Sequence, residues 1–199
     1  MEIEYKWKMP IIDIEKKLIE KLPVGTCIKK YEVISMHSSY YDTVDKKLKK
    51  RNIALRIRKE NEKEICYLKL RIKEDTNLFV RDEYAIETGN LKRGFDFFIA
   101  KTELKELLEG VNFDDINEIC VIDFKRKLYQ IEYSFGDVRF DAELCFDIGC
   151  GKKEIKTPIS EIELELVNGD EELFCNYATK LQELFLLDRE DRSKIAQIK

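Results

Sequence analysis

Carboxylates alternate with apolar residues in two segments that lie far apart in the chain. The first reads Glu-Ile-Glu-Tyr-Lys over residues 2–6, and the second reads Glu-Ile-Glu-Leu-Glu-Leu over residues 161–166. Side chains on a β-strand point to opposite faces in turn, so each segment would place all its carboxylates on one face. Carboxylates aligned in this way repel one another unless a cation lies among them. The spacing therefore indicates either a divalent metal or a cluster of Arg and Lys side chains.

Charged residues, most of them basic, alternate with apolar residues in the same manner on the other predicted strands. Besides Lys6, the residues on the charged faces are Arg56, Arg58, Lys69, Arg71, Arg81, Glu83, Arg126, Glu143 and Asp147. The opposite faces carry mainly Leu and Ile, and rows of exposed Leu and Ile on so many strands would cause aggregation. We therefore expect the apolar faces to be covered and the charged faces to be turned inward around a shared space.

Hydrophobic periodicity predicts the elements that position these groups. Besides the N-terminal strand, we expect strands over residues 28–41, 54–58, 65–71, 79–87, 119–134, 137–147 and 159–167. Helical patterns begin at Pro10 and cover residues 95–109 and 170–187, and residues 44–52 form a polar, lysine-rich segment. We expect turns around Asn61, at Gly136-Asp137, and at Gly149 and Gly151.

Hairpins and few helices favour an α+β fold with an antiparallel sheet. We predict a closed eight-stranded antiparallel β-barrel, a tunnel with a charged lumen, with the helices packed on its outside, because closure removes the sheet edges. We expect a single domain over residues 1–199. The alternative is an ordinary sandwich whose charged outer faces are held by cross-strand ion pairs. Evenly mixed surfaces do not usually sort charge by strand, so we favour the barrel.

Composition excludes several classes of function. Charged residues make up 38% of the chain but the net charge is only −4, so no nucleic-acid partner driven by bulk positive charge is expected. No apolar run approaches the ~20 residues of a membrane span, and no signal region is visible, so we expect a cytoplasmic protein. The six cysteines contain no C-x-x-C pair and are interpreted as reduced thiols rather than zinc ligands. His37 is interpreted as a strand or loop residue rather than a catalytic base.

Such a lumen would suit a polyanion together with a divalent cation. Arg binds phosphate oxygens in bidentate fashion, Lys adds point charge, and carboxylates are the oxygen ligands that Mg²⁺ and Mn²⁺ prefer. A triphosphate carries enough negative charge to need many cations and a metal. Phosphoryl transfer requires mainly positioning and charge neutralisation, which suits a chain without a Walker-type loop.

The ordered motifs resemble the CYTH superfamily, also called triphosphate tunnel metalloenzymes. The resemblance covers nearly the whole chain. It rests on the E-x-E-x-K segment 2–6, the YYDT segment 40–43, the LRIR segment 55–58, Lys69, the R-x-E pair Arg81 and Glu83, segment 123–126, Glu143, Asp147, the E-x-E-x-E segment 161–165 and Ser193-Lys194.

The resemblance implies a triphosphate site that uses Mg²⁺ or Mn²⁺. It implies Glu2, Glu4, Glu163, Glu165 and Asp147 as metal ligands, and Lys6, Glu4, Arg56 and Arg58 as catalytic residues. It implies phosphate binding by Lys6, Arg56, Arg58, Lys69, Arg81, Arg126 and Lys194. Arg71 has no clear counterpart in the family, and Tyr5 and Trp7 should be outward core residues.

The activity that the resemblance implies is metal-dependent hydrolysis of a small-molecule triphosphate. Ser193-Lys194 and the compact chain favour inorganic triphosphate, cleaved to diphosphate and phosphate. A class IV adenylate cyclase or a thiamine triphosphatase on the same fold remains an alternative. A non-catalytic binder of polyphosphate or nucleotide is an alternative of another class. A nucleic-acid-binding barrel ranks last, because the charged faces carry almost no aromatic residues. The sequence leaves the oligomeric state open, a homodimer included.

Overall fold

The computed structural model describes residues 2–9, 13–71 and 79–198, and for Glu2, Arg71 and residues 79–81 it describes the backbone only. The side chains of Glu2, Arg71 and Arg81 therefore lie outside what the structure describes. No helix in these ranges is long and apolar enough to cross a bilayer. The elements are β1 (Glu2–Lys8), α1 (Ile14–Glu20), β2 (Thr26–Thr43), α2 (Lys47–Lys50), β3 (Ile53–Glu60), β4 (Lys63–Arg71), β5 (Phe79–Glu87), α3 (Leu91–Ile99), α4 (Thr102–Lys105), the 3₁₀ turn η1 (Phe113–Asp115), β6 (Ile116–Phe135), β7 (Val138–Lys152), β8 (Lys156–Gly169), α5 (Glu171–Phe185) and α6 (Lys194–Gln197).

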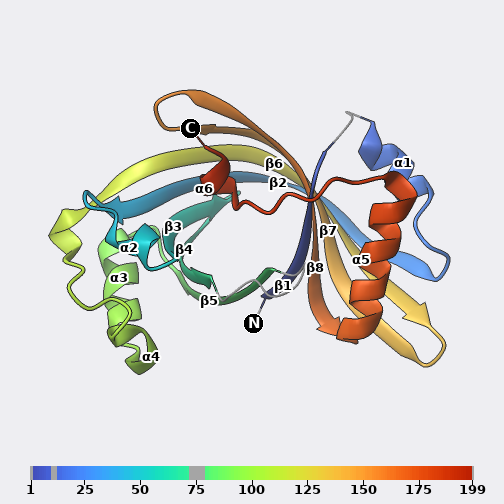
Figure 1. Cartoon of the computed structure of the whole chain (residues 1–199), viewed down its shortest axis with the longest axis horizontal. Coiled ribbons are helices and arrows are strands. Elements are labelled where there is room, and N and C mark those ends of the chain that lie inside the picture. Colours follow the sequence, from blue (N-terminus) through green and yellow to red (C-terminus); the bar gives the residue numbers. More distant parts are fainter. Residues whose placement is uncertain (1, 10–12, 72–78, 199) are drawn as a thin grey trace.

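Eight antiparallel strands pair in the order β1-β5-β4-β3-β2-β6-β7-β8, and β1 also pairs with β8. The longest ladders join β2 to β6, β6 to β7 and β7 to β8, and these strands arch across the whole molecule (Figure 1). The register places Glu4 opposite Glu165 and Lys6 opposite Glu163, so the two acidic motifs predicted from the sequence lie side by side.

The strand order returns from β8 to β1 as in a barrel, but the seam between β1 and β5 corrects the prediction that the eight strands alone close it. Among the residues that the structure describes, three pairs join these strands, from Glu2↔Arg81 to Glu4↔Phe79. Beyond them, β1 pairs instead with residues 188–190, which we call the C-terminal strap. Lys8 donates a backbone hydrogen bond to Asp188 at 2.8 Å, and Glu190 donates one to Lys6 at 3.1 Å. Strand β5 alone therefore does not close the sheet. Along residues 6–8 of β1, the strap occupies the place of a neighbouring strand.

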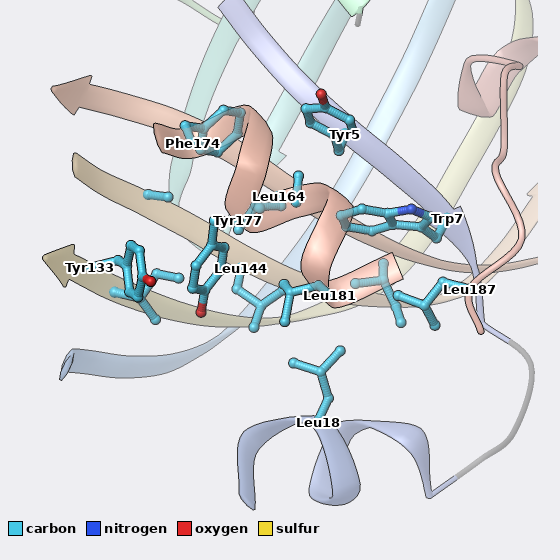
Figure 2. Close-up of a cluster of buried hydrophobic side chains, with 14 of the residues drawn as sticks. Tyr5, Trp7, Leu18, Tyr133, Leu144, Leu164, Phe174, Tyr177, Leu181 and Leu187 are labelled. Atoms are coloured by element: carbon cyan, nitrogen blue, oxygen red, sulfur yellow. The ribbon is translucent and has the colours of Figure 1, made fainter. Parts of the chain in front are cut away.

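Two hydrophobic cores lie outside the sheet. The larger one packs α5 and α1 against β1, β6, β7 and β8; Figure 2 shows Tyr5, Trp7 and Leu164 facing Phe174 and Leu181 of α5. Trp7 is fully buried and donates a hydrogen bond from Nε1 to Gln182 at 2.9 Å. Tyr5 and Trp7 are therefore outward core residues, as expected. The second core packs α3 and α4 against β3 and β4 around the buried residues Leu55, Leu68, Phe95, Phe98 and Leu104.

A third apolar cluster lies inside the sheet and gives a second correction to the predicted fold. Ile122 and Phe124 share the face of β6 that carries Arg126, so they point into the lumen. Ile195 and Ile198 of the C-terminal segment pack against them. Helix α6 accordingly lies within the arch of strands rather than outside it (Figure 1), and one wall of the lumen is apolar rather than charged.

Some element boundaries also differ from the prediction. The helix expected over 95–109 is two helices, α3 and α4, and α3 begins earlier because the Asn90 side chain caps it by accepting from the Arg93 N–H. No turn occurs at Gly149 or Gly151, since β7 continues to Lys152. The lysine-rich segment contains α2, and α6 was not foreseen. The hairpins at Asn61 and Gly136 are confirmed, with φ of 53° and 61°. Pro10, at the predicted helix start, lies outside the described residues.

Candidate functional site

A cavity of about 420 Å³ opens inside the strands. Its lining includes six cationic side chains from five elements together with three glutamates. They are Lys6, Arg56, Arg58, Lys69, Arg126 and Lys194, with Glu4, Glu163 and Glu165. These are nine of the residues that the sequence assigned to the site; β-strand alternation turns eight of them to one side, and Lys194 reaches the same side from α6. The cavity also reaches the apolar residues Ile119, Cys120 and Ile198, which belong to the wall that α6 covers.

Three carboxylates of the lumen form a charge network with three cations. The carboxylates are Asp147, Glu161 and Glu163, and the cations are Arg126, Lys194 and Lys6. Arg126 donates from Nε and Nη2 to the two oxygens of Asp147 at 2.8 and 2.7 Å, and from Nη2 also to Glu163. Lys194 Nζ lies 2.7 Å from Asp147 Oδ2 and 2.8 Å from Glu163 Oε1, and it also pairs with Glu161. Every member is at least nine-tenths buried, so the charges compensate one another in a region with little screening.

The pKa values follow from this compensation. Burial alone would favour the neutral form of each group, but the opposing charges prevail. The charges of Arg126 and Lys194 lower the pKa of Asp147, and those of Lys194 and Lys6 lower the pKa of Glu163 far below its usual range. The carboxylates in turn raise the pKa of Lys194 well above its usual value. All these groups are therefore charged at neutral pH.

Lys6 connects the network to the open cavity. Its Nζ lies 3.1 Å from Glu163, 3.8 Å from Glu161 and 3.9 Å from Glu4. Burial lowers its pKa, but these three carboxylates outweigh burial and leave the pKa raised. Lys6 therefore remains protonated at neutral pH and can donate hydrogen bonds, but it is not suited to accept a proton from water.

The opposite wall carries positive charge with few acidic partners. Arg56 donates to the Tyr40 hydroxyl at 3.3 Å, and its guanidinium lies 4.8 Å from the centre of the Tyr67 ring. Arg58 lies over the same ring at 5.7 Å and forms a long ion pair of 3.6 Å with Glu60. Burial and the neighbouring guanidinium groups of Arg56 and Arg126 lower the pKa of Arg58. Burial raises the pKa of Tyr40, but Arg56 and Arg58 outweigh it and leave the pKa lowered.

The sites predicted as metal ligands fall into two groups. Asp147 and Glu163 have their oxygens bound by Arg126 and Lys194, so these two carboxylates already have cationic partners. Glu4 and Glu165 lie opposite each other across the β1–β8 ladder and line the cavity. Asp147 and Glu163 also lie beside Glu161, which was not among the predicted ligands. These three carboxylates bring oxygens within 4.8 Å of one another. The backbone of Glu2 lies on the same face of β1 as Glu4.

Sequence reasoning did not assign several residues that the structure brings to the site. Glu161 shares the parity of Glu163, so its signal was present in the alternating motif. Tyr40 was quoted within the YYDT segment but given no role. Three lysines that line the cavity, Lys46, Lys49 and Lys153, have no periodic signal, because Lys46 and Lys49 belong to the start and body of the four-residue helix α2 and Lys153 lies in the loop between β7 and β8. Lys69 lines the cavity as predicted and forms an ion pair with Glu83.

Comparison with known proteins is consistent with this geometry. No curated protein matches the chain in sequence. Among solved structures, it is similar to a putative adenylyl cyclase from Hippeastrum, described as having a dominant triphosphatase activity, at 20% identity and a TM-score of 0.60, covering 98% of this chain and 94% of that one. It is also similar to a protein of Pyrococcus horikoshii OT3 at 18% identity and a TM-score of 0.57, with both chains covered completely. A putative adenylate cyclase from Bacillus halodurans gives 20% identity and a TM-score of 0.57, covering 97% of this chain and 94% of that one.

At these identities the solved structures establish the shared fold only. The family model described as the CYTH domain matches residues 1–198, which is almost the whole chain. The resemblance inferred from the motifs is thereby confirmed, and the chain belongs to the CYTH domain family.

Proposed function

We propose that this protein hydrolyses a triphosphate in a metal-dependent reaction, and that inorganic triphosphate, cleaved to diphosphate and phosphate, is its substrate. The observation that carries the proposal is the cluster of the Arg56, Arg58 and Arg126 guanidinium groups that face the cavity. Burial and the charges of Arg56 and Arg126 lower the pKa of Arg58, and a polyanion would stabilise positive charges gathered in this way. The Hippeastrum relative, with its described triphosphatase activity, supports the same reaction class.

The donor set fits a hard divalent cation. Glu4 and Glu165 offer carboxylate oxygens from adjacent strands on one wall of the cavity, and Mg²⁺ and Mn²⁺ prefer such ligands. At Asp147 and Glu163 a metal would have to displace Arg126 or Lys194, whereas at Glu4 the nearby cation is Lys6, 3.9 Å away. When bound, the metal would neutralise phosphate charge and polarise a phosphoryl oxygen.

The side chains of the chain itself would bind and orient the substrate. Arg56 and Arg58 offer paired N–H donors to phosphate oxygens, and Arg126, whose Nε and Nη2 are bound to carboxylates, would add charge together with Lys6, Lys69 and Lys194. In hydrolysis a water oxygen forms a bond to the terminal phosphorus, the bridging P–O bond breaks, and diphosphate leaves with its electron pair while the proton of the water passes to solvent or a phosphate oxygen. Lys6, which stays protonated, would stabilise the charge on the phosphate oxygens.

Phosphate release should be measured from inorganic triphosphate, ATP and thiamine triphosphate with Mg²⁺, Mn²⁺ or EDTA, with cyclic AMP followed in the ATP reaction. Release from inorganic triphosphate that EDTA abolishes is the expected result. Cyclic AMP formation would identify a cyclase on this fold instead.

The variant Glu4→Gln separates an enzyme from a binder. An enzyme should lose about 100-fold or more in kcat, as when a group that stabilises transition-state charge is removed, while calorimetric binding of triphosphate without metal persists. The exposed substitution Glu172→Gln on α5 is the matched control. Hydrolysis by Glu4→Gln at the wild-type rate would refute the metal-site assignment.

A further inference from the structure

Strand β2 is longer than one of its two neighbours, and this leaves part of its edge open. On one side β2 pairs with β6 over Thr26–Thr43, whereas on the other side it pairs with β3 over Met36–Tyr41. In Figure 1, β2 accordingly continues beyond the hairpin of β3 and β4. Among the residues that the structure describes, no strand lies along the second side of β2 between residues 27 and 34. We call residues 27–34 the open edge of β2.

The contacts of Ser35 show which residues of β2 turn their backbone groups toward this edge. The Ser35 C=O accepts a hydrogen bond from the Asn61 N–H at 3.0 Å, and the Ser35 N–H donates to Asn61 Oδ1 at 3.1 Å. Asn61 lies at the tip of the β3–β4 hairpin, so both backbone groups of Ser35 point away from β6. Along a strand this direction repeats at every second residue. Val33 and Tyr31 therefore direct their N–H and C=O groups toward the open edge, which is the arrangement that an added strand requires.

The side chains along the open edge are exposed and of mixed character. Tyr31 and Val33 are each 49% exposed, and the Tyr31 ring lies 4.7 Å from the ring of Tyr129 on the outer face of the sheet. Lys30 and Glu32 lie on the opposite face, with Lys30 Nζ 3.0 Å from Glu32 Oε2. Charged side chains commonly protect an edge strand from pairing with a second copy. They favour such pairing only where the register places opposite charges against each other.

Few registers allow two identical antiparallel edges to pair about a twofold axis, because one residue must lie opposite its own copy. Placing Glu32 opposite Glu32, or Lys30 opposite Lys30, brings like charges together. Placing Val33 opposite Val33 sets Tyr31 against Ser35, whose backbone groups are already bonded to Asn61. Registers centred further along the strand meet the bulge between Ile28 and Lys30 or the β3–β4 hairpin.

The register with Tyr31 opposite Tyr31 avoids these conflicts. The two tyrosines would exchange backbone hydrogen bonds, and each Lys30 would lie opposite Glu32 of the other copy. The outer face would then carry a row of tyrosine rings, formed by Tyr129 and Tyr31 of each copy.

We propose that the open edge of β2 binds the same edge of a second copy of this chain, with Tyr31 opposite Tyr31 on the twofold axis. The two β2 strands form one continuous antiparallel sheet across the dimer. Charge complementarity between Lys30 and Glu32 of the other copy selects this register, and symmetry repeats it on both sides of the axis. The inference is independent of the proposed function, since none of the open-edge residues lines the cavity.

Charge reversal tests both the partner and the register. Sedimentation velocity over about a hundredfold range of protein concentration should show a monomer–dimer equilibrium for the wild type. K30E and E32K each bring like charges together on both sides of the axis, so the dissociation constant of each homodimer should rise about tenfold or more. An equimolar mixture of the two variants restores opposite charges and should form a heterodimer with about the wild-type dissociation constant. The double variant K30E/E32K should dimerise in the same way.

The control variants K92E and D96K reverse an exposed ion pair on α3 and should dimerise as the wild type does. Hydrogen exchange reports on the backbone: the Tyr31 amide should exchange about tenfold more slowly when the wild-type dimer is filled, and at the monomer rate in K30E.

A wild-type protein that stays monomeric over the whole range would overturn the proposal, whatever else the edge binds. A dimer that neither single variant weakens by more than about twofold would show that another surface is used. A mixture of K30E and E32K that does not associate, or a Tyr31 amide that the dimer does not slow, would overturn the register. Assemblies larger than a dimer would contradict it as well, because an edge paired about a twofold axis has no free copy left to bind.

Discussion

Replacing Lys194 by Met tests the central charge network. The substitution keeps the length of the side chain but removes an ammonium group that is 6% exposed and contacts Asp147, Glu161 and Glu163. Arg126 still binds Asp147 and Glu163, whereas Glu161 keeps a 3.8 Å contact to Lys6 and a hydrogen bond from Gln197 at 2.7 Å. Breaking a buried pair so that a charge is left without compensation costs about 3–5 kcal/mol.

We therefore expect the free energy of unfolding to fall by about 3 kcal/mol at pH 7, which corresponds to a drop in Tm of about 6–12 °C for a chain of this size. Urea denaturation followed by circular dichroism measures the first quantity and calorimetry the second. The exposed substitution Lys180→Met on α5 is the control and should stay within about 0.5 kcal/mol of wild type.

A double-mutant cycle with Asp147→Asn separates pairing from general damage. If Lys194 and Asp147 compensate each other, the double variant should be more stable than the sum of the two single losses predicts, by about 1–3 kcal/mol. A Lys194→Met protein that loses less than about 1 kcal/mol, together with a coupling energy near zero, would show that the network does not stabilise the fold as argued here.

Two further predictions concern stability. Because the pKa values of Asp147 and Glu163 are lower in the folded protein, their stabilising contribution is present above the unfolded values of about 3.9 and 4.3 and is lost as pH falls through the folded values. Urea titrations between pH 2 and pH 7 should therefore show the free energy of unfolding decreasing only below about pH 4, and a steep decrease between pH 7 and pH 5 would contradict the assignment. Trp7→Ala should destabilise the protein by about 3–5 kcal/mol, since it removes a fully buried ring and its hydrogen bond to Gln182. A loss below about 1.5 kcal/mol in denaturant titration would mean that the packing of α5 does not depend on this residue.

Strand alternation was sufficient to predict much of the site. The parity of Glu4, Lys6, Arg56, Arg58 and Arg126 is a local property of each strand, so it needs no knowledge of how the strands pair. A lumen residue in a strand is also marked by the apolar residues on either side of it, which must face a core. For that reason the charged faces, and the outward positions of Tyr5 and Trp7, could be read from the sequence.

The apolar wall of the lumen could have been noticed but was not. Ile122 and Phe124 share the parity of Arg126, which indicates that part of the inner face is hydrophobic. What covers that wall could not be predicted, because α6 has only four residues and too little periodicity to identify. The partners of Asp147 and Glu163 depend on Lys194, which reaches them from the far end of the chain. Pairing of that kind is set by tertiary contacts and leaves no local pattern.

The C-terminal strap bears on how the protein is made. Translation produces β1 before the strands that pair with it. The edge of β1 that pairs with β8 has no partner until β8 is made, and the opposite edge at Lys6–Lys8 lacks the strap until residues 188–190 emerge. Trp7 and Gln182, which share a hydrogen bond, are 175 positions apart. Contacts of such high sequence separation form slowly, and an unpaired strand edge is prone to associate with other chains in the meantime. Ribosome-bound chains that stop before the strap should therefore hold β1 as an accessible edge, so that capture by chaperones during synthesis ends once residues 188–190 have emerged and paired with β1.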